Sequence, residues 1–187
     1  MVDLIEEELG GASPERNRDS PSSPGTSRRS RMKPIGPKNE RAAIISGAGS
    51  GLGRAIAKEL VEAGIRCVIT GRRRAALEQT ADIIAGDRSR VLVVQGDVTA
   101  REDRARVLGE CLERLGRVDI LVNNAGISSA APLLEFGEQE WRQAMNTNLD
   151  RCFFLAKAVI PPMRDRGWGR IINIASVYST LGVNNDR

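Results

Sequence analysis

Apolar and polar residues follow one another along this chain in blocks that predict strands and helices in turn. Short apolar runs typical of buried strands lie at residues 42–46, 66–70, 91–95, 119–124 and 170–175. Between them, apolar residues recur with the period of an α-helix at 51–64, 75–85, 101–115 and 138–166. The chain therefore alternates strand and helix from about residue 41 onward.

Two of the predicted helices carry further signals. In the first helix the apolar residues recur at helical spacing and Gly64 suits its C-terminal stop; they are Leu52, Ile56, Leu60 and Ala63. In the last helix the pair Pro161–Pro162 should bend or break the final turns, because proline cannot donate a backbone hydrogen bond.

This alternation predicts the fold. Short apolar strands separated by helices form parallel sheets that are covered on both faces. Right-handed crossovers then give an α/β, Rossmann-type doubly wound parallel sheet. Ligands in such sheets bind at the carboxyl ends of the strands, so we expect the loops after the first and fourth strands to face one crevice.

Residues 1–38 differ from the rest of the chain. Five of the eight prolines fall there, among many serines, glycines and charges, so we expect a disordered tail before a folded domain of residues 39–187. Ser27–Lys33 resembles a twin-arginine export signal, but no apolar stretch follows it. The opening acids argue against an organelle transit peptide. A start site assigned too early, with Met32 as the true start, is also open.

Composition excludes several function classes. The chain is 41% hydrophobic with a net charge of +4, which does not suggest nucleic acid, and no apolar run is long enough to cross a membrane. Cys67, Cys111 and Cys152 are far apart and odd in number, so we expect a reducing, cytoplasmic location without disulfides. Histidine is absent, which excludes a Ser-His-Asp triad and every His-ligated metal site in this chain, and we expect no metal.

The loop after the first strand, SGAGSGLG at 46–53, is rich in glycine. The spacing is Gly47-x-x-x-Gly51-x-Gly53, which allows a tight turn and lets backbone N–H groups approach a pyrophosphate. The following helix directs its positive N-terminal end at the same place. Taken alone, such a loop could also serve plain strand-to-helix packing.

Several motifs in order resemble the short-chain dehydrogenase/reductase family over residues 41–187. Residues 46–53 are similar to its TGxxxGxG signature, with Ser46 in place of threonine. NNAG at 123–126, GDV at 96–98, NTNL at 146–149 and GRIINIAS at 169–176 are similar to its other signatures. The chain looks like the classical branch of the family, similar to 3-oxoacyl-carrier-protein reductases and sugar-alcohol dehydrogenases.

The resemblance implies a role for each matching residue. Gly47, Ser50, Gly51 and Gly53 would cradle the pyrophosphate, with Leu52 beside them. Asp97 would accept from the adenine amino group, with Val98 beside the ring, although Asp97 could instead cap the helix near residue 100. The wall of the cofactor crevice would be formed by Asn124, Ala125 and Gly126. Ser176 would hydrogen-bond the substrate carbonyl, and Asn148 would anchor a water that relays a proton.

The end of the second strand bears on cofactor choice. NAD-binding Rossmann proteins usually place a carboxylate there, whereas this chain has Thr70-Gly71 followed by Arg72-Arg73-Arg74. A guanidinium can pair bidentately with a 2′-phosphate, so we predict a preference for NADP(H) over NAD(H), with Arg72 as the chief contact. Alternatively, these arginines form a solvated helix start.

The family's catalytic tyrosine and lysine follow its serine farther along the chain than residue 187 reaches. Ser176 is followed by 11 residues, in which Tyr178 is two positions on and Gly182, not lysine, lies four beyond it. We therefore expect the N-terminal part of an NADP(H)-dependent oxidoreductase that interconverts a carbonyl and a secondary alcohol, truncated after the fifth strand. We expect this chain to be inactive alone and poorly soluble, because the fifth strand becomes an apolar edge.

Two other functions stay open. One is a non-catalytic dinucleotide-binding isoform, and the other is a fragment from an incomplete gene model. For partners, we expect a small carbonyl or alcohol substrate, no nucleic acid and no membrane. The resemblance also implies that the full-length protein is a homo-oligomer.

Overall fold

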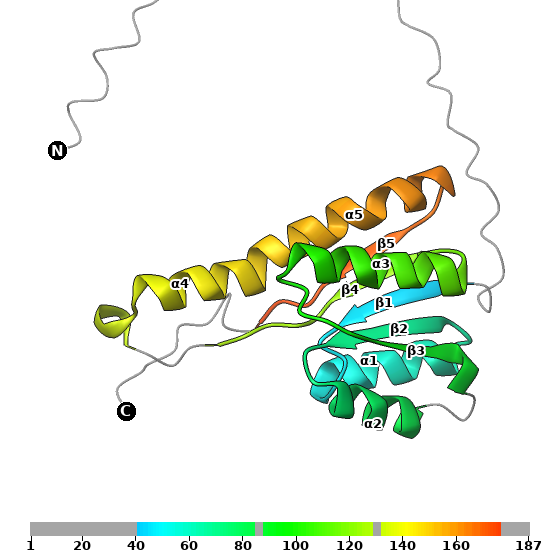
Figure 1. Ribbon diagram of the computed structural model, residues 1–187, viewed down its shortest axis with the longest axis horizontal. Helices are drawn as coiled ribbons and strands as arrows, with labels where there is room; N and C mark the ends of the chain where they lie inside the picture. The colour runs from blue at the N-terminus through cyan, green and yellow to red at the C-terminus, as the bar shows by residue number, and fades with distance from the viewer. Residues whose placement is uncertain (1–40, 85–87, 129–131, 177–187) are drawn as a thin grey trace, which may run out of the picture. The chain divides into compact units, whose positions relative to one another are not determined.

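The five expected strands form one parallel sheet in the computed structural model, which describes residues 41–84, 88–128 and 132–176 (Figure 1). They are β1 (Ala42–Ser46), β2 (Arg66–Gly71), β3 (Val91–Gln95), β4 (Ile120–Asn123) and β5 (Arg170–Asn173). Their order across the sheet is β3-β2-β1-β4-β5, and every neighbouring pair is parallel. The Rossmann-type fold is confirmed, whereas the predicted tail at 1–38 and Tyr178 lie outside the described residues.

The helices follow the predicted pattern with one interruption. They are α1 (Gly51–Glu62), α2 (Arg74–Ile84), α3 (Arg101–Leu115), α4 (Glu138–Met145) and α5 (Arg151–Asp165), with short 3₁₀ turns at Arg88–Arg90 and Leu133–Glu135. The single helix predicted over 138–166 contains a π turn, Asn146–Asp150, between α4 and α5. None of the described helices combines the length and apolarity that a membrane crossing requires.

The proline pair does not end the last helix. Pro161 and Pro162 lie inside α5, which continues to Asp165. The predicted break does not occur, and the alternative of a bend stays a prediction. A proline removes one backbone hydrogen bond to the preceding turn, and here both losses fall near the helix end, where α5 also buries Val159 and Met163 against the sheet.

Side chains of the strands alternate between two cores, one on each face of the sheet. Ala43 and Ile45 of β1 pack against α1 and α2, while Ala42 and Ile44 pack against α3 and α5. Figure 1 shows this layering, with α3 and α5 on one side of the strands and α1 and α2 on the other. β1 is buried along its whole length because helices cover both of its faces.

α1 buries only part of the apolar pattern that the sequence showed. Its buried residues are Gly53, Ala57 and Val61, while Ile56 and Leu60 only border the core. Leu52 is 57% exposed and Ala63 is also exposed. The reason is a close approach: a Cβ on Gly53 would lie 2.4 Å from the carbonyl oxygen of Gly47, so small residues face the sheet. Gly64 does stop the helix, with a φ of 85°.

The amino ends of β1 and β4 are tied by a buried carboxylate. Asp119 is fully buried, and its Oδ2 accepts hydrogen bonds from the backbone N of Ala42 at 2.9 Å and from Nε of Arg117 at 2.6 Å. A buried carboxylate is tolerated when it is paired and hydrogen-bonded in this way. This tie fixes the register of β1 against β4 at the end of the sheet opposite the predicted crevice.

β5 forms one edge of the sheet in the described part of the chain. Its four residues are mostly exposed, and Ile172 is 44% exposed. The sequence predicted an apolar edge at this strand, and the structure places it there. An edge of this kind presents unpaired backbone groups to other chains.

Candidate functional site

A crevice of about 540 Å³ opens at the carboxyl ends of the strands. Segments that follow β1, β2, β3 and β4 line it together with the end of α4. These residues are Gly47, Gly49, Ser50, Leu52, Gly53, Gly71–Arg73, Ala76, Leu77, Gly96–Thr99, Asn124–Ile127, Gln143, Asn146 and Thr147. The loops after β1 and β4 face one crevice, as the sequence predicted.

The glycine loop needs glycine for two reasons. Gly47 and Gly51 have φ angles of 69° and 53°, which side chains with a Cβ rarely adopt. A Cβ on Gly47 would lie 2.7 Å from Cα of Ala125. At Gly51, by contrast, a Cβ would meet nothing within 4 Å, so the loop borders open space at that point. The loop is thus packed tightly against Ala125 at Gly47 and borders open space at Gly51.

The first turn of α1 has backbone N–H groups that no capping side chain from Ser50 bonds. Ser50 occupies the N-cap position, but its side chain makes no capping hydrogen bond. The first backbone N–H groups of a helix have no partner within the helix. They therefore form the positive end of the helix dipole, and Ser50 and Leu52 border the crevice at this end.

Ser46 and Asn124 join the end of β1 to the end of β4. Ser46 Oγ accepts from the backbone N of Asn124 at 3.1 Å and of Ala125 at 3.2 Å. In the other direction, Asn124 Nδ2 donates to the carbonyl oxygens of Ser46 at 3.1 Å and Gly47 at 3.2 Å. The Asn124 amide therefore braces the glycine loop from the inside, a role that the sequence analysis did not assign.

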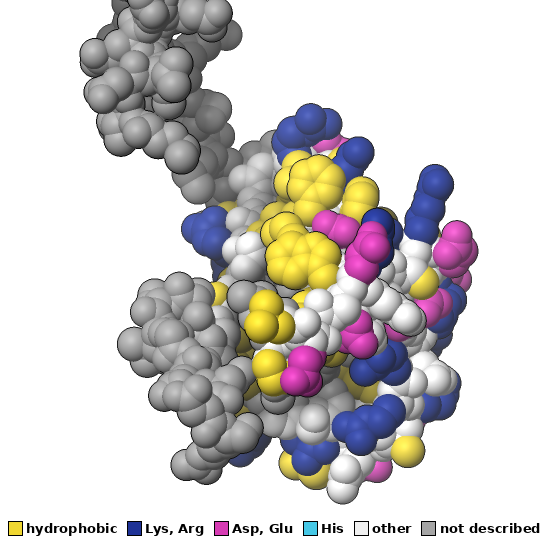
Figure 2. All heavy atoms as spheres, turned by 90° about the vertical axis from the view of Figure 1, so that its left-hand side faces the viewer, with side chains coloured by type: hydrophobic (Ala, Val, Ile, Leu, Met, Phe, Trp, Pro, Cys, Tyr) yellow, Lys and Arg dark blue, Asp and Glu magenta, His cyan; other side chains and the backbone are white. Residues whose placement is uncertain are grey.

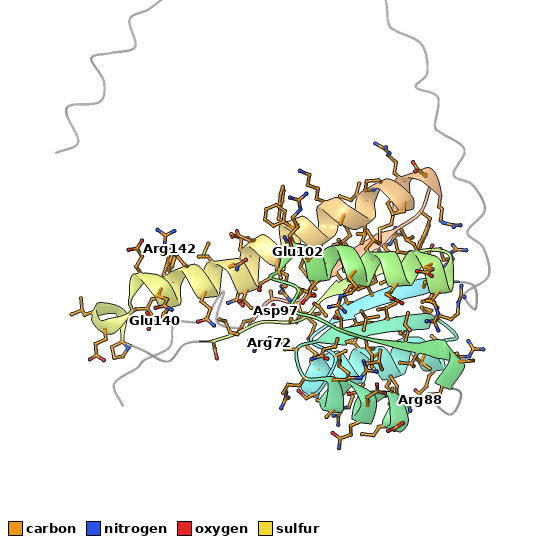
Figure 3. All side chains as sticks on the ribbon, viewed as in Figure 1. Arg72, Arg88, Asp97, Glu102, Glu140 and Arg142 are labelled. Carbon is orange, nitrogen blue, oxygen red and sulfur yellow. The ribbon has the colours of Figure 1, made fainter. Side chains whose placement is uncertain are left out.

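Two exposed arginines stand at the end of β2. Arg72 and Arg73 both line the crevice and are exposed, and among the described residues neither forms an ion pair. Arg72 and Asp97 also border a neighbouring cleft along β3, and Figure 3 shows them close together beside the strand ends. Arg74, the third arginine of the run, pairs with Glu78 at 3.1 Å. Of the three consecutive arginines, Arg72 and Arg73 thus line the crevice and Arg74 pairs within α2.

Asp97 is held by its neighbours. Its Oδ1 accepts from the backbone N of Thr99 at 3.0 Å and from Thr99 Oγ1 at 2.8 Å. Its own backbone N donates to Asp103 Oδ2 at 2.6 Å. Hydrogen bonds from the Arg106 side chain and then from the Asp97 backbone hold the pKa of Asp103 below its ordinary value, so this carboxylate stays charged. The alternative that Asp97 caps the helix near residue 100 is not realised, because its carboxylate accepts from Thr99, which precedes the N-cap residue Ala100 of α3.

Asn148 lies in the π turn and fixes the chain after β4. Its Nδ2 donates to the carbonyl oxygen of Ile127 at 2.9 Å, and its Oδ1 accepts from the Ile127 backbone N at 3.0 Å. π turns inside helices often lie at functional sites. Here the turn aims the Asn148 side chain at the wall of the crevice.

The structure brings together most of the predicted site. All predicted cofactor residues except Gly51 line the crevice, while Ser176 and Asn148 do not. Ser176 is exposed beyond the end of β5, and Asn148 acts on the crevice through Ile127. The binding and catalytic roles of these residues stay predictions. Among the described residues, no group of three potential ligands is placed to hold a metal ion.

Sequence reasoning missed several residues that shape the crevice. Asp103 orders the Asp97 loop, and Gln143, Asn146 and Thr147 contribute from the end of α4. The acids in the first turn of α3 were a usable signal for Asp103, because such residues often bond backbone N–H groups. The NTNL motif at 146–149 contains Asn146 and Thr147, but only Asn148 was given a role, and the π turn is what brings the other two to the crevice.

Comparisons with known proteins agree on one family. The family model described as short chain dehydrogenase matches residues 41–186. A D-beta-hydroxybutyrate dehydrogenase of Rhizobium meliloti is 36% identical over 146 residues, which are 75% of this chain and 55% of the relative. A 3-oxoacyl-acyl-carrier-protein reductase of Vibrio cholerae is 38% identical over 142 residues, which are 76% of this chain and 57% of the relative. The chain thus spans little more than half the length of these relatives.

Solved structures show the same likeness. A short chain dehydrogenase from Bacillus anthracis has a TM-score of 0.73 and 31% identity, over 76% of this chain and 60% of its own. A short-chain dehydrogenase/reductase from Caenorhabditis elegans, solved with cofactor, has a TM-score of 0.70 and 28% identity, over 79% of this chain and 56% of its own.

Gly53→Ala and Gly109→Ala should change stability in opposite directions. A Cβ at Gly53 collides with the Gly47 carbonyl at 2.4 Å, so we expect the free energy of unfolding to fall by about 3 kcal/mol. Gly109 is an exposed residue in α3 with nothing near its Cβ position. Alanine there should raise the free energy of unfolding by about 0.5–1 kcal/mol. Chemical denaturation measures both, and equal effects would contradict the close approach of the loop and helix.

Proposed function

We propose that this chain, which belongs to the short chain dehydrogenase family, binds NADP(H) in preference to NAD(H) and forms part of an oxidoreductase. The reaction is the interconversion of a carbonyl and a secondary alcohol. The observation that carries this proposal is the crevice itself, where an uncapped helix end and two exposed arginines lie along one groove.

The residues present fit a dinucleotide. The uncapped first turn of α1, where Ser50 and Gly53 line the crevice, suits a pyrophosphate, which the loop amides and the helix end would hold. Asp97 and Val98 line the part of the crevice that follows β3 and would take the adenine. The wall from Asn124 to Gly126, held by Ser46, would face the nicotinamide half.

The charge at the end of β2 supports the 2′-phosphate form. An NAD site usually has a carboxylate here that accepts from the ribose hydroxyl, and such a charge would repel a phosphate. This chain has Arg72 and Arg73 instead, both exposed to the crevice. A guanidinium binds phosphate through two parallel charge-assisted hydrogen bonds, so Arg72 would be the chief contact and Arg73 would add to it.

The remaining roles concern the reacting oxygen. When bound, the nicotinamide cofactor supplies or accepts the hydride. Ser176 would donate a hydrogen bond to the substrate oxygen and stabilise charge on it. Asn148, fixed by its two bonds to Ile127, would keep the crevice wall in place and anchor a water that relays a proton. The residues after Ser176 contain one tyrosine and no lysine, so the 187 residues lack the family's proton-transfer pair.

The names of the relatives indicate the substrate class only broadly. They refer to hydroxybutyrate, 3-oxoacyl and gluconate compounds. All three names describe molecules with a hydroxyl or keto group on a carbon chain. We therefore propose a small carbonyl or alcohol substrate.

Exposed apolar side chains along α4 and α5 support self-association. Trp141, Leu149, Phe153 and Ile160 are each between 47% and 61% exposed. Figure 2 shows apolar side chains gathered on the side from which α4 projects. The amino-terminal half of this helical segment carries Glu140 and the other half carries Lys157, whereas Glu138 and Arg164 pair with Arg142 and Asp165 in the same copy. Two antiparallel copies would thus match opposite charges, and we propose a homodimer through this face.

Arg72→Ala tests the cofactor preference. We expect the Kd for NADPH to rise roughly tenfold and the Kd for NADH to stay unchanged, because one charge-assisted phosphate contact is lost. Isothermal titration of both cofactors gives the two constants. Lys58→Ala is the control, since it removes the same charge from an exposed ion pair on α1. Comparable affinity of the unmodified chain for NADPH and NADH would contradict the preference.

The 187-residue chain should bind NADPH without turning it over. Loss of a general acid alone costs about 10²–10⁴ in rate, and the missing lysine adds to that loss. Absorbance at the NADPH maximum with a panel of ketones should therefore stay constant over hours. Binding without turnover also suits a non-catalytic dinucleotide-binding isoform, whereas steady oxidation of NADPH by this chain would refute the assignment of the missing pair.

Phe153→Arg should convert a dimer to a monomer. The substitution places like charges at the centre of the proposed interface, where Phe153 is 61% exposed in one copy. Sedimentation velocity measures the mass. Ile83→Arg is the matched control, because Ile83 is 55% exposed on α2, which covers the other face of the sheet. A chain that is already monomeric at micromolar concentration would exclude this interface.

A further inference from the structure

Arg54 makes three side-chain hydrogen bonds beneath the glycine loop. It lies in the first turn of α1 and is half-buried. Its Nη2 donates to the carbonyl oxygen of Gly49 at 2.9 Å and to Gln79 Oε1 at 3.3 Å, and its Nε donates to Thr80 Oγ1 at 2.9 Å. Thr80 is fully buried in α2. One side chain of α1 thus joins the loop to α2.

The bond to Gly49 fixes the direction of a neighbouring amide. No cis peptide occurs among the described residues, so the Gly49–Ser50 peptide is trans. In a trans peptide the C=O and the following N–H point to opposite sides of the chain. Because Arg54 holds the Gly49 carbonyl toward α2, the Ser50 N–H points away from α2. Ser50 lines the crevice, where an amide in that direction can meet an anion.

The contact with α2 is supported by packing. A Cβ on Gly49 would lie 3.1 Å from Cβ of Ala76, so the loop touches the start of α2. α2 begins directly after Arg72 and Arg73. The Arg54 bonds therefore set the distance between the loop that would hold the pyrophosphate and the segment that would hold the 2′-phosphate.

The charge of Arg54 is not neutralised locally. Its three acceptors are two amide-type oxygens and a hydroxyl, and among the described residues it forms no ion pair with a carboxylate. A guanidinium without a carboxylate partner adds positive potential below the loop. Both its geometry and its charge therefore favour an anion above Gly49 and Ser50.

We infer that Arg54 is a positioning residue of the dinucleotide site, which orients the Ser50 amide toward the pyrophosphate by holding the Gly49 carbonyl against α2. This inference rests on the proposed function. Arg54 does not touch the ligand, and its effect reaches the pyrophosphate through the Gly49–Ser50 peptide. It is therefore distinct from Arg72, which would contact the cofactor directly.

Titration with two ligands distinguishes a role of Arg54 in positioning the pyrophosphate site from a general loss of binding. The full chain is titrated with NADPH and with adenosine 2′-monophosphate, which carries the 2′-phosphate but no pyrophosphate. For Arg54→Met we expect the Kd for NADPH to rise roughly tenfold, the loss typical of a charge-assisted hydrogen bond. The Kd for adenosine 2′-monophosphate should stay unchanged. Arg54→Lys, which can still reach the Gly49 carbonyl, should recover most of the NADPH affinity.

Two controls complete the design. Lys58→Met removes the same charge from the exposed face of α1 and should leave both constants unchanged. Thr80→Val keeps the charge of Arg54 but removes one of its anchors, so it should weaken NADPH binding less than Arg54→Met does. If Arg54→Met does not fold by circular dichroism, Arg54→Lys and Thr80→Val carry the test.

The outcomes distinguish this inference from the function on which it rests. Unchanged NADPH affinity in Arg54→Met, or an equal loss for both ligands, overturns the positioning role while the proposed function stands. If the unmodified chain binds NADH but not NADPH, the proposed cofactor preference is wrong. The role of Arg54 is then tested by whether Arg54→Met raises the Kd for NADH and leaves the Kd for adenosine unchanged. If the unmodified chain binds neither cofactor, both conclusions are refuted.

Discussion

The hydrogen bonds between Ser46 and Asn124 are the constraint on which the rest of the site depends. They join the ends of β1 and β4, two strands that lie side by side but are far apart in the sequence. One hydroxyl serves two backbone N–H groups, and one amide serves two backbone carbonyls. Without these bonds, four backbone groups near the sheet would lose their partners, at a cost comparable to a lost hydrogen bond for each. The glycine loop, the NNAG segment and the floor of the crevice therefore form one unit.

This arrangement places unsatisfied polar groups below the crevice. Arg151 is 2% exposed, and in the part of the chain that the structure describes its guanidinium donates to Ser46 Oγ and to Cys152 Sγ, each at 3.3 Å. Among the described residues, Arg151 Nε, Asn123 Oδ1 and Thr70 Oγ1 are buried without a hydrogen-bond partner. These three lie near the carboxyl ends of the strands or the start of α5, while Arg41 Nε and Trp168 Nε1, which are buried in the same way, lie before the amino ends of β1 and β5. Burying polar groups without partners costs stability, and proteins tolerate that cost mainly where function requires it.

The sequence predicted most of the fold, because its strongest signals were local. β1, β3 and α3 have the predicted bounds, and Gly64 and Gly116 end their helices in left-handed conformations. The errors have a common physical cause, since tertiary contacts overrode local patterns. α1 turned a small-residue face to the sheet because Gly53 must pass the Gly47 carbonyl closely. The π turn at 146–150 was not visible in a pattern of apolar spacing.

The candidate site was predicted less completely than the fold. Motifs located the residues around the crevice, but they did not show where each side chain would be used. The Asn124 amide points into the glycine loop, and Asn148 is engaged with Ile127. Arg54 has no motif of its own, because its partners Gly49 and Thr80 belong to different elements. Such roles depend on which groups the fold brings within hydrogen-bonding distance, and a single sequence does not contain that information.

The proposed cofactor preference rests on local charge rather than on the net charge of the chain. The net charge of +4 is spread over 187 residues, and salt screens exposed charges beyond about 8 Å at physiological ionic strength. The positive charge at the end of β2 depends on which groups the acids near Arg72 bond. Asp97 turns one carboxylate oxygen to Thr99, and Asp103 is held by Arg106 and by the Asp97 backbone. Arg106 offsets the charge of Asp103, whereas the neutral Thr99 donors orient the Asp97 carboxylate without cancelling its charge. Arg72 and Arg73 outnumber that one acid at the end of β2, so under the proposed function a ligand with an additional phosphate there would gain from their positive charge.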